Sequence, residues 1–231
     1  MAEEGSSVKL LGLWPSPYVN RVQISLKLKS IDYEFIEEPF GPKSDLLLKS
    51  NPAHKKIPVF FHNQRAISES LIIVQYIDEQ WSSGHSILPS NPLDRANARF
   101  WAAYADDEWF PALKNILMAS EEERLVLEVK MKEGLAFLEE TFVKSSEGKA
   151  FFGGDDISFL DIAFGSFLGW LKAVEKLTGV SFLDESSVPH LVVWADNFLS
   201  HEAVNGIIPE PDALVEVAKM IKAMVESQAK N

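Results

Sequence analysis

Few residues in this chain combine a reactive group with a position that suits chemistry. Ser16 is the clearest, because it precedes a proline and follows an apolar segment at residues 8–14, which is the pattern of a strand leading into a helix. Its hydroxyl can either cap that helix or donate a hydrogen bond to a bound anion. Glu69 and Ser70 open a second helical segment, which Ser68 is placed to cap. The unpaired N–H groups and positive dipole end at a helix start suit a carboxylate ligand.

Other catalytic and metal-binding arrangements are missing from the sequence. It contains no cysteine, which excludes disulfides, thiolate metal sites and a cysteine nucleophile. It also lacks the glycine-rich phosphate loops and the nucleophile elbow of hydrolases. A Ser-His-Asp arrangement built from distant residues stays open. The five histidines do not have metal-site spacing, so we expect no metal and no cofactor.

The elements that position Ser16 and Glu69 fall within the first 83 residues. Apolar segments and turn residues there predict strands and helices in the order β-α-β-α-β-β-α, at residues 8–14, 17–29, 32–38, 44–49, 58–62, 65–68 and 69–81. A helix between the first two strands makes them parallel, whereas the short turn between the last two makes an antiparallel hairpin. The sequence therefore predicts a mixed sheet.

The rest of the chain is helical in pattern. A stretch rich in Ser, Pro and Gly indicates a linker at residues 84–93. Five helices are expected after it, at residues 93–118, 121–145, 158–178, 188–200 and 211–228. Ser158 and Asp161 have the spacing of a capping box. The prediction is an α/β domain at 1–83 followed by an all-α domain at 94–231.

The charge distribution narrows the possible partners. The formal net charge is −12, of which residues 1–83 carry −1 and residues 84–231 carry −11. Nucleic acids and anionic membranes both require a basic surface, so neither is an expected partner. No apolar run reaches the ~20 residues of a membrane span, and the acidic start lacks the features of a secretory signal. An anionic ligand would find the near-neutral first third more favourable.

Five segments carry a resemblance to a known family. They are WPSPYVNRV (14–22), KSDLLLKSNP (43–52), NPAHKKIPV (51–59), SESLIIVQYIDEQW (68–81) and FFGGDDISFLDIAF (151–164). Together they resemble the plant tau class of cytosolic glutathione transferases over essentially the whole chain. The resemblance implies a thioredoxin-like first domain, a helical second domain, and an enzyme that conjugates reduced glutathione to hydrophobic electrophiles in detoxification.

The same resemblance assigns roles in glutathione binding. Ser16 is the expected catalytic residue, donating its O–H to the glutathione thiolate. The peptide bond between Ile57 and the following proline is expected to be cis, with the Ile57 backbone pairing with the cysteinyl part of the ligand. Glu69 would bind the ligand ammonium and Ser70 the γ-glutamyl carboxylate. The glycyl carboxylate would lie near Lys43 and Lys56. Lys55 is read as a solvated surface lysine, and Arg21 as a member of an internal ion pair.

The acceptor pocket is expected to lie beside the thiol. By family position its lining comprises Trp14, Tyr18, Phe110, Lys114, Leu117 and Trp170, with the helix at 211–228 as a further wall. Pro111 departs from the family pattern and bears on the register of the helix around it.

Two other functions stay open at this stage. One is a ligandin-like, non-catalytic carrier of hydrophobic small molecules, and the other is glutathione-dependent reduction of organic hydroperoxides. In every case glutathione is a co-substrate or ligand rather than a resident cofactor. The resemblance further implies a cytosolic homodimer, whereas the physiological acceptor is not encoded in any motif of the sequence.

Overall fold

A computed structural model describes residues 7–228 of the chain. Its contacts form two compact units, residues 1–88 and residues 89–231. The first six residues, which bear on the expected lack of a secretory signal, lie outside the described part. The helices at residues 7–228 are all too short or too polar to span a bilayer.

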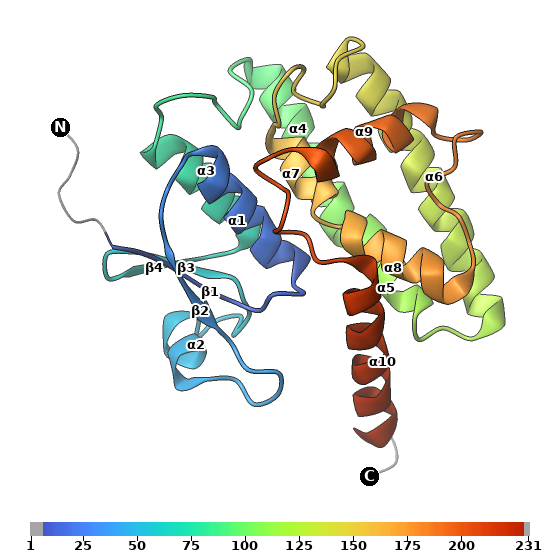
Figure 1. Cartoon of the computed structure of the whole chain (residues 1–231), viewed down its shortest axis with the longest axis horizontal. Coiled ribbons are helices and arrows are strands. Elements are labelled where there is room, and N and C mark those ends of the chain that lie inside the picture. The colour runs from blue at the N-terminus through green and yellow to red at the C-terminus, as the bar shows by residue number, and fades with distance from the viewer. Residues whose placement is uncertain (1–6, 229–231) are drawn as a thin grey trace. The chain divides into compact units, whose positions relative to one another are not determined.

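The first unit has the predicted order of strands and helices (Figure 1). Its elements are β1 (Val8–Gly12), α1 (Pro17–Leu28), β2 (Glu34–Glu37), α2 (Asp45–Ser50), β3 (Val59–His62), β4 (Arg65–Ser68) and α3 (Ser70–Gln80). The sheet order is β2-β1-β3-β4. β1 pairs with β2 in parallel, whereas the β1–β3 and β3–β4 pairs are antiparallel. The prediction of a mixed sheet is therefore confirmed.

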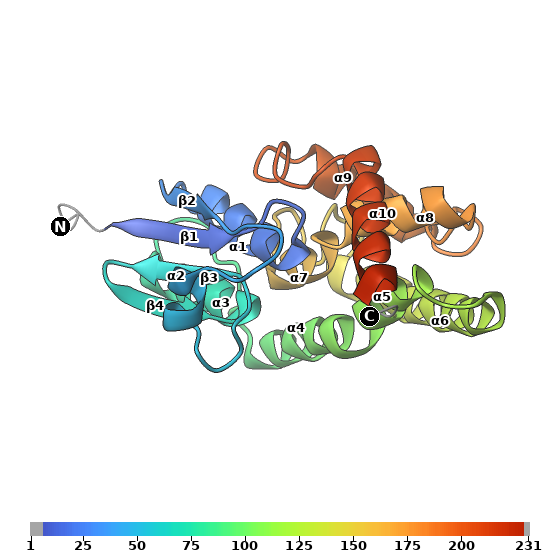
Figure 2. The same ribbon diagram turned by 90° about the horizontal axis from the view of Figure 1, so that it is seen from below.

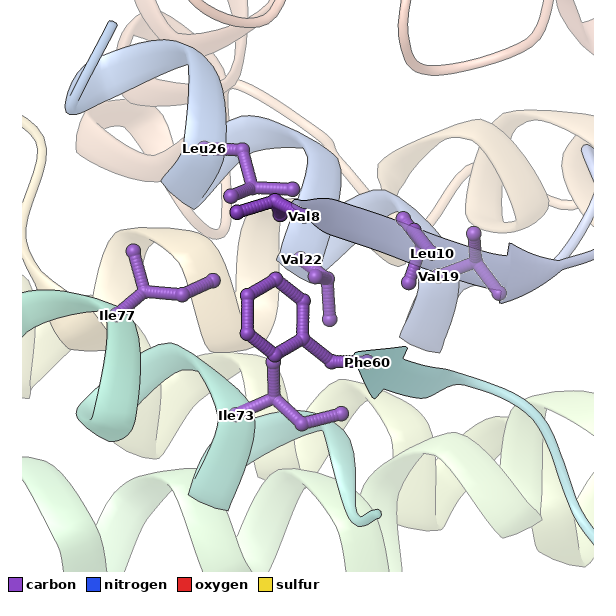
Figure 3. Close-up of a cluster of buried hydrophobic side chains, with 8 residues drawn as sticks. All are labelled: Val8, Leu10, Val19, Val22, Leu26, Phe60, Ile73 and Ile77. Carbon is purple, nitrogen blue, oxygen red and sulfur yellow. The ribbon is translucent and has the colours of Figure 1, made fainter. Parts of the chain in front are cut away.

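Alternation along the strands gives this sheet two apolar faces. On one face, a cluster of buried side chains joins β1 and β3 to α1 and α3 (Figure 3): Val8, Leu10, Val19, Val22, Leu26, Phe60, Ile73 and Ile77. On the other face, Leu11 and Val59 pack with Leu47 of α2. Because successive strand residues point to opposite faces, Leu10 and Leu11 serve different helices. The sheet is thereby held between α1 and α3 on one face and α2 on the other.

A buried ion pair closes the end of the first unit. Lys29, which follows α1, lies 2.7 Å from Asp78 of α3, and both side chains are almost fully buried. Asp78 also accepts hydrogen bonds from the N–H groups of Ile87 and Leu88, at 2.9 Å each. Burial by itself would raise the pKa of Asp78, but the Lys29 ammonium and the two N–H groups outweigh it and hold the pKa below its ordinary value. The pair thus anchors the segment that follows α3.

The second unit is built from helices. They are α4 (Pro92–Tyr104), the π-helical turn η1 (Ala105–Trp109), α5 (Phe110–Ile116), α6 (Glu121–Ser146), α7 (Phe159–Gly165), α8 (Leu168–Thr178), α9 (Pro189–Ser200) and α10 (Pro211–Gln228). Within this unit α5 packs along α6, and α10 packs against α8 (Figure 2).

Two of the helices predicted for the second unit are not continuous in the structure, so these predictions are wrong. The helix predicted at 158–178 is two helices, with a break at Ser166 and Phe167. The residues of α7 and the start of α8 are all buried, so the apolar pattern has no polar face that would mark the break. The helix predicted at 93–118 is also interrupted, by the π turn described below.

The predicted capping box at the start of α7 is present. The fully buried Asp161 carboxylate accepts from the N–H and the hydroxyl of Ser158, from the N–H of Phe152 and from the indole of Trp194. Burial raises the pKa of Asp161, while these donors act in the opposite direction. The same carboxylate therefore fixes the start of α7 and its packing against α9.

The π turn explains how the chain passes Pro111. The N–H of Phe110 donates to the carbonyl of Ala105, five residues back, instead of four. Pro111 has no N–H and cannot make the next helical bond. One residue more in the turn rotates the following side chains by about 100° relative to an uninterrupted α-helix. The side chains of α5 therefore face other directions than the spacing from α4 predicts.

Candidate active site

The strand register brings the predicted glutathione-binding segments to one edge of the sheet. Gly12 at the end of β1 pairs with Glu37 at the end of β2, and Leu11 pairs with Val59 at the start of β3. Val59 in turn pairs with Ser68, the last residue of β4. The C-terminal ends of β1, β2 and β4 and the start of β3 thus lie side by side, and together they form one edge of the sheet, at the ends of its strands. The segments that continue from them carry Ser16, Lys43, Lys56, Ile57, Glu69 and Ser70.

Ser16 is the N-cap residue of α1. Its hydroxyl oxygen accepts a long hydrogen bond of 3.4 Å from the N–H of Val19, and its own N–H donates to the carbonyl of Leu13 at 3.0 Å. A hydroxyl that accepts through a lone pair keeps its proton for another partner. No residue among 7–228 accepts that proton. The Ser16 O–H is therefore available to an acceptor placed at the helix start.

The turn before β3 is fixed by a buried asparagine. Asn51, the C-cap of α2, donates through its amide to the carbonyl of Lys56 at 2.9 Å and accepts from the N–H of His54 at 3.2 Å. The expected cis bond between Ile57 and Pro58 is present. The Ile57 N–H and C=O have no partner among the described residues. This turn consequently offers one free donor and one free acceptor of the main chain.

Ser70 forms part of a buried polar network. The fully buried Arg21 of α1 donates through Nη1 to the Ser70 hydroxyl oxygen at 3.2 Å and lies over the ring of Tyr18 at 5.2 Å. A guanidinium group only donates, so the Ser70 hydroxyl accepts from Arg21 and keeps its proton for a different acceptor. The hydrogen bond from Arg21, 49 positions earlier in the chain, therefore leaves the Ser70 proton for a ligand.

Glu69 begins α3 without capping it. It occupies the N-cap position with φ +73°, and its side chain makes no capping hydrogen bond. The expectation that Ser68 caps this helix is wrong, because Ser68 is still paired within β4. The first N–H groups of α3 are therefore not satisfied by a cap. The Glu69 carboxylate is more than half exposed and lies 4.0 Å from Nε2 of His54.

The lysines predicted near the glycyl carboxylate are exposed. Lys43 lies in a loop whose ends are joined by the buried Glu38, which accepts at 2.7 Å from both the N–H and the hydroxyl of Ser44. Lys55 and Lys56 lie in the turn that Asn51 fixes. None of the three ammonium groups has an acidic partner within residues 7–228, although the chain has an excess of acids. Unpaired cations at this edge favour an anionic ligand.

The residues predicted for the acceptor pocket belong to both units. In the first unit, Trp14 is partly exposed and Tyr18 is half-buried beneath Arg21. In the second, Phe110 is buried and its ring stacks on Phe167 at 4.0 Å. The remaining three comprise an exposed side chain on α5, its half-buried C-cap and a half-buried residue of α8: Lys114, Leu117 and Trp170.

Four further residues shape this edge without having been assigned to it from the sequence. They are Arg21, Glu38, Asn51 and His54. Arg21 is expected in an internal ion pair, whereas Asn51 and His54 lie in the segment NPAHKKIPV (51–59) without an assigned role. Glu38 carries no sequence signal, since its partner Ser44 is six residues away.

Comparison with known proteins agrees with the geometry. The sequence matches the family "Glutathione S-transferase, N-terminal domain" over residues 6–79 and "Glutathione S-transferase, C-terminal domain" over residues 100–202. It is 55% identical to glutathione S-transferase U17 of Arabidopsis thaliana over 218 residues, which are 94% of this chain and 96% of the relative.

Solved structures give the same result. The tau-class glutathione S-transferase of mango (Mangifera indica) matches with a TM-score of 0.90 and 59% identity, over 93% of this chain and 98% of that one. A rice glutathione transferase in complex with glutathione matches with a TM-score of 0.87 and 33% identity, over 96% and 98%.

An α/β unit with a mixed four-stranded sheet, followed by a helical unit, is the architecture of glutathione S-transferases. This chain belongs to the glutathione S-transferase family, and within it to the plant tau class. The predicted family, fold class and enzyme class are confirmed.

Proposed function

We propose that this chain activates the thiol of glutathione with Ser16 and conjugates it to hydrophobic electrophiles, by aromatic substitution or Michael addition. The observation that carries the proposal is the unused Ser16 O–H at the start of α1, on the sheet edge that also carries the free Ile57 backbone groups. The mango and Arabidopsis relatives, which are named glutathione S-transferases, support it.

Each group of glutathione has a partner of matching chemistry at this edge. The cysteinyl amide groups pair with the N–H and C=O of Ile57, as an added short strand. The γ-glutamyl carboxylate accepts from the Ser70 hydroxyl and the free N–H groups at the start of α3. The ligand ammonium pairs with Glu69, and the glycyl carboxylate with Lys43 and Lys56.

Ser16 acts as a hydrogen-bond donor rather than as a base. A free thiol has a pKa near 8.5, so only about 3% is ionised at pH 7. Lowering that pKa by two units requires ~2.7 kcal/mol of preferential stabilisation of the thiolate. The Ser16 O–H and the positive end of α1 supply it, and the thiol proton leaves to solvent. The thiolate then forms the carbon–sulfur bond. In an aromatic substitution the halide leaves with its electron pair, and in a Michael addition the π bond of the acceptor breaks and the resulting carbanion takes a proton from solvent.

The acceptor pocket is proposed from Trp14, Tyr18, Phe110, Lys114, Leu117 and Trp170, with α10 as a further wall. Apolar side chains there bury a hydrophobic acceptor without fixing its identity. Phe110 contributes through its stack on Phe167, which holds the ring in place.

We further propose a cytosolic homodimer. The helical unit exposes large apolar side chains on α4 and α6, including Leu93, Phe100, Leu125, Val126 and Val129. Exposed apolar side chains of this kind are found at interfaces, and a second copy would cover them. Sedimentation at micromolar concentration tests this point.

The test of the main proposal is conjugation of 1-chloro-2,4-dinitrobenzene with glutathione. We expect turnover well above the uncatalysed rate. Calorimetry with glutathione is measured in parallel. Binding of a hydrophobic ligand without turnover would instead identify a ligandin-like carrier, and reduction of cumene hydroperoxide without conjugation would identify a peroxidase.

A further inference from the structure

A titratable side chain lies next to the carboxylate that is proposed to bind the glutathione ammonium. Nε2 of His54 is 4.0 Å from Oε1 of Glu69. The sequence alone does not relate these two residues to each other. The two come from different elements, His54 from the turn after α2 and Glu69 from the junction of β4 and α3. The His54 N–H is bound by Asn51, so the backbone that carries the imidazole is fixed opposite Glu69.

The charge of His54 decides what it does to Glu69. A neutral imidazole leaves the carboxylate's charge to the ligand, whereas an imidazolium pairs with it and repels a second cation at the same place. We propose that protonated His54 competes with the glutathione ammonium for Glu69, so that glutathione binds more weakly as the pH falls. This inference rests on the function proposed above, in which Glu69 holds that ammonium.

His54 is the histidine that lies next to this carboxylate. The charged side chains on the neighbouring elements are Asp45 and Lys49 of α2, Lys55 and Lys56 of the same turn, Arg65 of β4, and Asp78 and Glu79 of α3. Lysine and glutamate side chains ordinarily keep their charge between pH 5.5 and 7.5, whereas histidine ordinarily titrates within it. The histidine of the neighbouring strand β3, His62, is bound instead to the Tyr76 hydroxyl of α3 at 2.6 Å, so the proposed pH dependence is assigned to His54.

The expected effect is modest because water reaches both groups. The side chains of His54 and Glu69 are 59% and 53% exposed. An exposed ion pair of this type changes an equilibrium by roughly two- to five-fold. The coupling is reciprocal, so glutathione binding should also release a proton from His54 in this range.

The experiment uses S-methylglutathione, whose thioether cannot ionise. This choice removes the pH dependence that thiolate formation would add. The dissociation constant is measured by calorimetry at pH 5.5 and pH 7.5. For the unaltered chain it should be about two- to five-fold higher at pH 5.5. For His54→Asn it should be the same at both pH values, and His54→Lys should bind at pH 7.5 as weakly as the unaltered chain does at pH 5.5.

His85→Asn is the matched control, because His85 is an exposed histidine of the same unit. It should retain the pH dependence of the unaltered chain. The inference is overturned if His54→Asn retains that dependence, or if the unaltered chain has none. If S-methylglutathione does not bind at pH 7.5 at all, the proposed function itself fails, which is a separate and distinguishable result.

Discussion

The α/β unit and the helical unit prepare their proposed binding surfaces by different means. In the α/β unit, the candidate residues stand at strand ends and helix starts, and backbone groups and hydroxyl protons provide most of the chemistry. In the helical unit, the candidates are side chains on α5 and α8, whose directions follow from helix register and packing. A polar peptide ligand suits the first arrangement, and a variable apolar ligand suits the second.

The two units also differ in what holds them together near these surfaces. Long-range polar links such as Arg21–Ser70 and Lys29–Asp78 join the elements of the α/β unit. In the helical unit, close packing dominates at the π turn, where Trp109 lies against the backbone of Gly134. Losing a polar link leaves a buried group without its partner, whereas altering a close contact forces neighbouring side chains apart. Five substitutions break or sharpen this contrast.

The largest effect is expected for Asp78→Asn. Removing the carboxylate leaves the buried Lys29 ammonium without its counter-ion, which should cost about 3–5 kcal/mol of unfolding free energy at pH 7. The exposed pair of Lys149 and Asp155 provides the control, since Asp155→Asn should change stability far less. Urea unfolding measures both.

The same variant has a signature in its pH dependence. The pKa of Asp78 is lowered in the folded chain, so its carboxylate stabilises the fold above the ordinary aspartate pKa, near 3.9, and that contribution is lost as the pH falls through the lower folded-state value. The stability difference between the unaltered chain and Asp78→Asn should therefore shrink on acidification. A difference that stays constant down to acid unfolding would contradict the role of the charge.

Ser16→Ala should lower the conjugation rate by about 10²–10³-fold, or ~2.7–4 kcal/mol, because it removes the donor to the thiolate. Glutathione affinity should change little, since the Ile57 backbone, Glu69 and Ser70 remain. The thiolate of bound glutathione should then form at a higher pH, which ultraviolet absorbance detects. Ser120→Ala removes another N-cap serine, at α6, and should leave the rate unchanged. If the thiolate forms at the same pH in the unaltered chain and in Ser16→Ala, Ser16 is only a helix cap.

Ser70→Ala and Glu69→Gln should each raise the glutathione dissociation constant by about 10- to 150-fold. Each removes a hydrogen bond to a charged group, which is typically worth about 1.5–3 kcal/mol. Calorimetry gives the constants, and urea unfolding separates a loss of affinity from a loss of fold. Glu79→Ala, an exposed change on the same helix, should have no effect. Unchanged glutathione affinity in both variants would show that the start of α3 does not bind glutathione.

Gly134→Ala tests the helical unit and should cost about 1–3 kcal/mol of stability by overpacking. An added Cβ would lie 2.6 Å from Cδ1 of Trp109 and 2.9 Å from the Tyr104 hydroxyl. At an open helix position the same change would stabilise by up to about 1 kcal/mol, so the sign is diagnostic. Ala136→Gly on the exposed side of α6 should cost about 1 kcal/mol from helix propensity alone. A stabilised Gly134→Ala variant would show that the π turn adjusts freely.

The contrast also explains which parts of the protein could be predicted. Ser16, Ile57, Glu69 and Ser70 are predicted through the family resemblance of short segments, and the helix starts and the turn that hold these residues are local features that the sequence signals. The π turn was missed, because a widened turn depends on Pro111 lacking an N–H while Trp109 packs against a helix that begins twelve residues later. Helical spacing counted across that turn therefore predicts the wrong directions for the side chains of α5.

The sequence by itself determined the order of the elements and the residues at the strand ends, since these depend on local chemistry and on alternation of apolar residues, and the resemblance of five segments indicated the family. The tertiary structure decided how the hydroxyl and carboxylate groups are directed. It placed Arg21 within hydrogen-bond distance of Ser70 and His54 close to Glu69, and it brought four chain segments to one edge through the register of the sheet. The physical reason is that a hydrogen bond between distant segments forms only after packing has fixed both of their elements, and packing has no local code.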